Sequence, residues 1–170
     1  MRSRSRPTGR LFLLLSEKPL CKKDRNGYNE RKEKGADGLT VYLCLDDRGG
    51  LLFGGRRQSR DACLLADLAA MVPEGLTIDP FSEKLIAAAG IPYTLAEEFL
   101  PEDAHFFLEN RNPEDLLPLA HKLVIYRWNR RYPSDVRWEG NPGDHGFTLA
   151  ETTEFPGKSH ETITKEVYVK

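Results

Sequence analysis

The chain has 170 residues, 39% of them hydrophobic and 30% charged, and its 25 basic side chains nearly balance its 26 acidic ones. This length predicts one domain with a sizeable buried core, and this composition excludes an intrinsically disordered chain. The nearly neutral balance also excludes a global field that would select a polyanionic partner, so any such attraction has to be local.

The first residues are basic and precede a short apolar run. This run, residues 11–15, is shorter than the roughly 7–15 residues of a signal-peptide core, and nothing reaches the ~18 apolar residues of a membrane span. We therefore expect a basic tail over 1–9, no signal peptide, no membrane partner and a cytoplasmic protein. Cys21, Cys44 and Cys63 match neither zinc nor CxxC spacing, so reduced thiols are expected, with Cys44 and Cys63 as small core residues.

In the first half of the chain, a strand is expected over 10–15, followed by a charged loop insertion over 16–38 with almost no apolar content. Residues 39–45 are apolar on both faces, which predicts a central strand, and 51–53 predict a short return strand. Ser59 is expected to cap a helix that ends before Pro73, with an apolar face made of Leu64, Leu65, Leu68 and Met71.

The second half continues this alternation. We expect a strand over 76–79, a helix over 82–89 ended by Gly90, a further helical turn over 94–100, a strand over 105–110, a short helix or loop over 113–121 and a strand over 122–130. Residues 147–155 and 161–170 have period-2 patterns and predict a closing antiparallel hairpin. The sequence thus predicts a single α/β domain over 10–170, with a mostly parallel sheet and an antiparallel edge.

A stretch rich in glycine and arginine, LDDRGGLLFGGRRQSRD, covers residues 45–61. It is either a hairpin with solvated arginines or a loop whose backbone and guanidinium groups approach an anionic ligand. The candidate ligand-binding residues here are Gly49, Gly50, Gly54, Gly55, Arg56, Arg57 and Arg60.

A second group of candidates follows two expected strands. Alternation along 122–130 sends Leu123, Ile125 and Arg127 to one face of the strand and Val124, Tyr126, Trp128 and Arg130 to the other. Asn129 and Arg130 would line a cleft at the carboxyl end of this strand, where open α/β sheets bind ligands, whereas Tyr126 and Trp128 either join them or belong to the core. At the end of the strand expected over 105–110, Asn110 and Arg111 are further candidate ligand-binding residues.

Two segments resemble the dihydrofolate reductase fold family. LCLDDRGGLLFGGRRQSRDACLLADL is similar to its strand, mobile loop and acid-bearing helix, and HKLVIYRWNRRYPSD with TTEFPGKSHETITKEVYVK is similar to its closing strands. The resemblance covers residues 39–90 and 120–170. It implies a mixed sheet flanked by helices, NADPH as a possible cofactor, a reductase activity and Asp61, or in another register Asp67, as the substrate-binding acid.

The same resemblance marks two cofactor positions. Ser82 in DPFS stands where the family has a cofactor contact, and the glycine-rich turn that would hold a pyrophosphate falls near 108–112, where the chain has LENRN. Side chains there obstruct the close approach that glycine permits.

His160 is a second catalytic candidate, in addition to Asp61, and could act as a general acid or base. It cannot pair with its neighbour Glu161 within a strand, because adjacent side chains point to opposite faces. His105, His121 and His145 have no metal-ligand spacing, so no metal site is expected.

Three hypotheses remain open from the sequence. The first is a protein that binds a small anionic or nucleotide-like ligand, and it includes an NAD(P)H-dependent reductase. The second is an RNA- or phosphodiester-directed protein with His160 as acid or base and with arginines that contact phosphates: Arg56, Arg57, Arg60, Arg111, Arg130 and Arg131. The third is a non-catalytic protein whose 16–38 loop binds a partner. The sequence indicates neither a substrate nor an oligomeric state.

Overall fold

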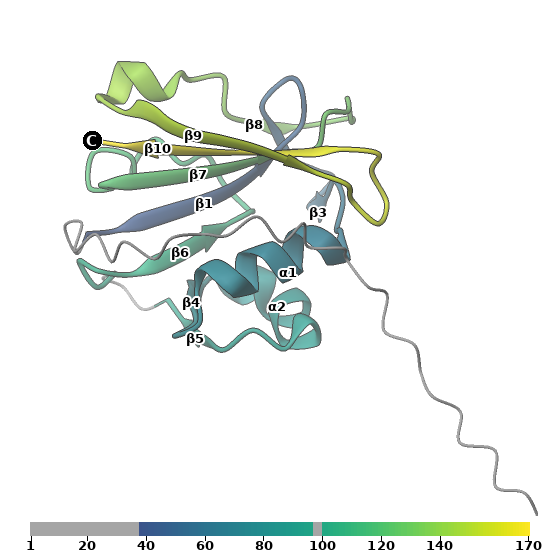
Figure 1. The fold of residues 1–170 in the computed structure, drawn as a ribbon, viewed down its shortest axis with the longest axis horizontal. Coiled ribbons are helices and arrows are strands. Elements are labelled where there is room, and N and C mark those ends of the chain that lie inside the picture. The colour runs from purple at the N-terminus through teal and green to yellow at the C-terminus, as the bar shows by residue number, and fades with distance from the viewer. Residues whose placement is uncertain (1–37, 97–99) are drawn as a thin grey trace, which may run out of the picture.

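The structure is a computed structural model that describes residues 38–96 and 100–170. The expected tail over 1–9, the strand over 10–15 and all but the last residue of the 16–38 loop lie outside the described residues. The described residues form a main sheet of seven strands in the order β5-β4-β6-β1-β7-β10-β9, with β9 at the top of Figure 1, and a small sheet in the order β3-β2-β8.

The main sheet consists of β1 (Thr40–Leu45), β4 (Leu76–Ile78), β5 (Tyr93–Leu95), β6 (His105–Leu108), β7 (Lys122–Arg127), β9 (Thr148–Phe155) and β10 (Ile163–Val169). The small sheet consists of β2 (Gly50–Phe53), β3 (Arg56–Arg57) and β8 (Val136–Arg137).

The pairing of the strands confirms the predicted fold class. β1 is parallel to both β6 and β7, and β4 is parallel to β5 and β6. β10 is antiparallel to β7 and β9, which makes the expected closing hairpin. The protein therefore has a mixed sheet, mostly parallel, with an antiparallel C-terminal hairpin.

β1 is the central strand, and all six of its residues are buried. Tyr42 and Cys44 belong to one hydrophobic core, while Val41, Leu43 and Leu45 belong to another on the opposite face of the sheet. β7 divides in the predicted way: Val124, Tyr126 and Trp128 pack in the first core, and Leu123 and Ile125 in the second. This confirms that Tyr126 and Trp128 are core residues.

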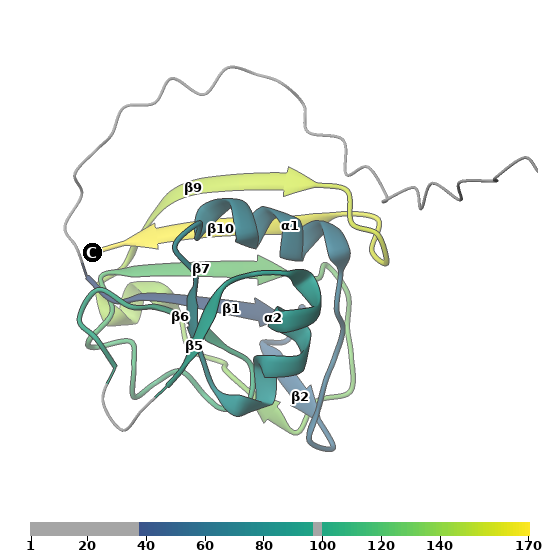
Figure 2. The same cartoon turned by 90° about the horizontal axis from the view of Figure 1, so that it is seen from below.

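Both α-helices of the described residues cover one face of the sheet (Figure 2). α1 (Ala62–Met71) buries Leu64 and Leu68, and α2 (Glu83–Ala89) ends at Gly90 in a left-handed conformation, as predicted. The core on the opposite face is completed by loop residues, among them Leu116, Leu117 and Trp138, and by Phe147 after the 3₁₀ turn η2 (Pro142–His145). A second 3₁₀ turn, η1 (Pro80–Ser82), precedes α2. Neither α-helix is long and apolar enough to span a bilayer.

Three expectations are wrong. The N-cap of α1 is Asp61 and not Ser59, because the Asp61 carboxylate accepts the N–H of Cys63 at 2.8 Å. Thr94 and Leu95 extend β5 alongside β4 instead of forming a helical turn, and 97–99 lie outside the described residues. Cys44 is a buried free thiol as expected, whereas Cys63 is disulfide-bonded and not reduced.

The strand expected over 122–130 ends earlier, at Arg127. Asn129 has a left-handed φ of 52°, which is incompatible with extended backbone, so the chain turns away from the sheet here. The strand expected over 105–110 also ends early, at Leu108.

Gly49 provides a test of this packing. Its φ is 73°, and a Cβ atom there would collide with the carbonyl oxygen of Trp138, so Gly49→Ala should destabilise the protein by roughly 1–3 kcal/mol from backbone strain and by more from the clash. Gly54→Ala is the matched control, because Gly54 has a φ of 57° with no atom within 4 Å of the added Cβ. Urea denaturation of both variants measures the difference, and equal losses would contradict the clash.

Candidate functional site

The carboxyl ends of β1, β6 and β7 lie at one edge of the main sheet, because these strands are parallel and adjacent. We call this the carboxyl edge. Figure 1 shows β3 and β8 of the small sheet beside the arrowheads at this edge. Open α/β sheets bind ligands at such an edge, so the predicted site residues are located relative to it.

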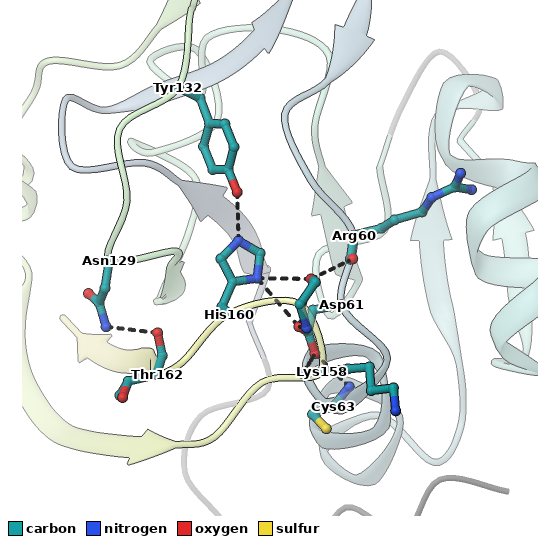
Figure 3. Close-up of polar contacts among 9 residues, drawn as sticks. Arg60, Asp61, Cys63, Asn129, Tyr132, Lys158, His160 and Thr162 are labelled. Atoms are coloured by element: carbon teal, nitrogen blue, oxygen red, sulfur yellow. Dashed lines mark hydrogen bonds and ion pairs between the residues drawn. The ribbon is translucent and has the colours of Figure 1, made fainter.

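Asp61 and His160, the two candidate catalytic residues, are 99 positions apart in sequence and meet at this edge (Figure 3). The buried Asp61 carboxylate accepts the backbone N–H groups of Lys158 at 2.9 Å and Ser159 at 2.6 Å, and the Ser159 hydroxyl at 2.9 Å. With the N–H of Cys63, four donors surround it. His160 Nδ1 lies 3.4 Å from Asp61 Oδ2.

These donors determine the ionisation of Asp61. Burial alone would raise the pKa of this carboxyl group, but the N–H groups of Lys158, Ser159 and Cys63 and the Ser159 hydroxyl stabilise the anion. Together they hold the pKa of Asp61 well below its ordinary value. Asp61 is therefore a carboxylate at neutral pH, and protein donors occupy it.

His160 continues the hydrogen-bonded array away from Asp61. Its Nε2 lies 2.9 Å from the Tyr132 hydroxyl, and its ring stacks on Trp128 with 4.6 Å between ring centroids. An ionised Asp61 favours the proton on Nδ1, so Nε2 accepts from Tyr132. Only 2% of the His160 side chain is exposed, so this array is mainly internal.

A hollow of about 470 Å³ lies beside His160. Three of the candidate site residues line it: Asn129, Arg130 and His160. The Asn129 amide donates to the Thr162 carbonyl at 3.2 Å and to the Thr164 hydroxyl at 2.8 Å, whereas Arg130 is exposed. The expected cleft at the end of β7 is thus present, and its role in binding remains a prediction.

The glycine and arginine stretch is a hairpin in its backbone. Gly54 and Gly55 have left-handed φ angles of 57° and 69° and connect β2 to β3, and the Gly54 N–H donates to Asp135 at 2.7 Å. Gly49 belongs to the preceding turn between β1 and β2, and Gly50 begins β2. Contact of these glycines with a ligand stays a prediction.

Asp46 organises that preceding turn and was not among the candidates. Its buried carboxylate accepts the backbone N–H groups of Arg48 at 2.8 Å, Gly50 at 2.7 Å and Tyr132 at 2.9 Å. Burial opposes ionisation, but these donors and Gln58 lower the pKa of Asp46 below its ordinary value. The only sequence signal was the acidic pair Asp46 and Asp47 at the end of an apolar strand.

Arg57 and Ser82 converge on Glu109, which the sequence analysis also missed. Arg57 donates to Glu109 Oε2 at 3.1 Å and to the Phe81 carbonyl at 3.2 Å, and the Ser82 hydroxyl donates to Glu109 Oε2 at 2.6 Å. Burial raises the pKa of Glu109, although Ser82 and Arg57 oppose that shift. A cavity of about 10 Å³ remains beside this pair, so these side chains fill most of the room at the carboxyl ends of β1 and β6.

The remaining candidates lie at the same edge without joining one cluster. Arg111 lies 3.8 Å from Asp79, and the Asn110 side-chain oxygen is buried with no hydrogen-bond partner in the part of the chain that the structure describes. Arg60 borders α1, and Arg56 lies on β3; both are exposed. Residues 38–96 and 100–170 contain no group of three or more His, Cys, Asp or Glu side chains placed to hold a metal ion.

Comparison with solved structures identifies the fold as dihydrofolate-reductase-like. The chain is similar to the dihydrofolate reductase from Enterococcus faecalis complexed with NADP(H) and RAB-propyl, with 10% sequence identity and a TM-score of 0.53. The match covers 78% of this chain and 96% of that chain. No protein-family model matches the sequence, and no curated protein matches it significantly. The similarity therefore establishes the fold alone.

Asp61→Asn tests the carboxylate at the centre of the array. The amide would place an N–H group against the donors of Ser159, so we expect a loss of about 1–3 kcal/mol in the free energy of unfolding near pH 7. Because the folded pKa of Asp61 lies below the unfolded value of about 3.9, the carboxylate stabilises the fold above that pH and loses its contribution as the pH falls further.

The difference between wild type and Asp61→Asn should therefore shrink when urea denaturation is repeated near pH 3. Asp135→Asn is the control, since Asp135 is exposed and accepts one backbone N–H, from Gly54. A difference that is constant with pH would contradict the assigned ionisation.

Proposed function

We propose that this protein binds a small anionic, nucleotide-like ligand at the carboxyl edge of its main sheet. The distribution of arginine carries the proposal. Of the nine arginines of the described residues, eight lie on segments that end or follow β1, β6 and β7, or on β3 and β8 beside that edge, and Arg60 lies between β3 and α1. Arginine guanidinium groups are suited to phosphate and carboxylate, and this edge is where open α/β sheets bind ligands.

Binding is better supported than hydride transfer. NADPH is the first cofactor to test, because the similar enterococcal enzyme was determined with NADP(H). However, the ion pair of Arg57 and Glu109 lines a cavity of about 10 Å³ beside the carboxyl ends of β1 and β6, roughly the volume that holds one water. A reaction at this cavity would require the ion pair to separate, and no other observation supports hydride transfer, so we propose ligand binding.

One observation favours a nucleic-acid ligand as the second candidate. Arg56, Arg60, Arg130 and Arg131 are exposed and form no ion pair with the described residues. Because they lie on separate segments along the edge, an extended phosphate backbone would contact more of them than a small molecule. Its binding would weaken steeply with salt, whereas a small ligand in a cleft would respond much less.

The other expectations from the sequence stay predictions. The 16–38 loop proposed for partner binding lies outside the described residues except for Gly38. The organisation of residues 10–170 as a single domain also stays a prediction. The cytoplasmic location rested partly on reduced cysteines, and the disulfide bond of Cys63 removes that argument.

A thermal-shift titration with NADPH, NADH, FMN, folates, mononucleotides and a short RNA, at low and high salt, tests the proposal. We expect saturable stabilisation by a mononucleotide or dinucleotide that persists at high salt. Replacing both Arg130 and Arg131 by alanine should reduce it, because these exposed cations lie at the carboxyl edge. Lys122→Ala is the control, since Lys122 begins β7 and lies at the opposite edge.

Two results would contradict the proposal. One is a response to RNA alone that disappears at high salt, which would favour the second candidate. The other is the absence of stabilisation by any anionic compound.

A further inference from the structure

A cleft of about 460 Å³ opens beside the carboxyl ends of β1 and β7, on the face of the sheet opposite α1 and α2. Three arginines from three separate segments line it: Arg48 after β1, Arg127 at the end of β7 and Arg137 in β8. Buried Leu45 and Trp138 also line it. None of these three arginines was among the candidate ligand-binding residues.

Hydrogen bonds hold the side chains of Arg127 and Arg137 and the backbone of Arg48. The backbone N–H of Arg48 donates to Asp46 at 2.8 Å, which fixes the turn that carries this residue. Arg127 Nε donates to Glu166 Oε2 at 2.8 Å, and the Tyr168 hydroxyl donates to the same oxygen at 3.0 Å. Arg137 pairs with Gly50 across the small sheet, and its Nε donates to the Ser134 carbonyl at 3.3 Å. The cleft is therefore preorganised, which lowers the entropic cost of binding.

The residues that line the cleft carry a net positive charge. Arg48, Arg127 and Arg137 contribute three positive charges and Glu139 one negative charge, which leaves +2. Three further carboxylates lie behind the lining, each already engaged: Glu166 by Arg127, Glu114 by the Trp138 indole and Asp46 by the Arg48 backbone. Glu166 is already paired with Arg127. The two other arginines form no ion pair within residues 38–96 and 100–170, so their guanidinium groups are available to an anion.

We infer that this cleft binds the phosphate group of the ligand. The inference rests on the proposed function and names the anionic group and its site. A planar carboxylate is satisfied by the parallel donors of one guanidinium, whereas a phosphate monoester presents three terminal oxygens in a tetrahedral arrangement. Guanidinium groups on three separate segments match the second geometry. Gly49 and Gly140 also line the cleft, so the backbone there presents no side chain to obstruct the phosphate.

Isothermal titration calorimetry with inorganic phosphate, AMP, adenosine and acetate, at constant ionic strength, tests this site. We expect phosphate and AMP to bind saturably, and adenosine and acetate to bind much more weakly. Arg48→Ala and Arg137→Ala should each weaken phosphate binding about tenfold, the loss expected for one charge-assisted hydrogen bond. Lys84→Ala, which removes an exposed cation of α2 on the opposite face of the sheet, should leave the affinity unchanged.

Glu139→Gln provides a test of opposite sign. It removes a negative charge from the cleft lining, so phosphate should bind more tightly, by a factor of about 2–5 for a partly solvated pair. General unfolding cannot produce this gain, and circular dichroism of each variant checks that the fold is intact.

The outcomes separate this inference from the proposed function. Saturable AMP binding that Arg48→Ala and Arg137→Ala do not weaken overturns the phosphate cleft but leaves ligand binding at the carboxyl edge intact. An equal loss in Lys84→Ala also overturns the cleft, since it indicates diffuse electrostatics. Equal affinity for acetate overturns the assignment to phosphate. If no anionic compound binds in calorimetry or in the thermal-shift titration, both proposals fail.

Discussion

The carboxylate of Asp61 is the constraint on which the geometry of the carboxyl edge depends. It joins the first turn of α1 to the loop before β10, which lies 98 positions away in sequence. Through His160 the array reaches the hydroxyl of Tyr132, and the backbone N–H of Tyr132 donates to the second buried carboxylate, Asp46. The loops after β1, β7 and β9 are thus connected by hydrogen bonds, so they need no ligand to order them.

This internal order limits the chemistry available at the edge. The pKa of Asp61 is low and its oxygens already have four donors, so it is poorly suited to deliver a proton to a substrate. His160 has a hydrogen-bond partner at each ring nitrogen. Arg57 and Glu109 pair with each other beside the carboxyl ends of β1 and β6. Two open volumes lie beside β7, one on each face of the sheet, and a third of about 510 Å³ lies between α1, α2 and the loop before β10, where Arg60, Asp61 and Lys158 line it. These features fit binding better than catalysis.

Periodicity and local chemistry were enough to predict both α-helices, the long strands β1, β7, β9 and β10 and the division of β7 between two cores, because those depend on neighbouring residues. They predicted a helical turn where β5 lies and did not predict β8. Local chemistry made His160 a candidate, whereas Asp61 became one through the family resemblance. Local patterns selected Ser59 and not Asp61 as the helix cap, since both residue types cap helices well and the contacts of Asp61 to Lys158 and Ser159 are long-range. Glu109 was missed because its partners Arg57 and Ser82 come from distant segments, and the cleft arginines were missed because their three segments meet only in the fold.

The cap at Asp61 also bears on where an anion can bind. Helix N-termini commonly hold phosphate groups through free backbone N–H groups and the helix dipole. In this protein the Asp61 carboxylate accepts the N–H of Cys63 and places its own negative charge at the start of α1. A ligand phosphate there would meet an anion. The positive charge for an anionic ligand therefore has to come from side chains, and the cleft of Arg48, Arg127 and Arg137 supplies it on the face opposite α1 and α2.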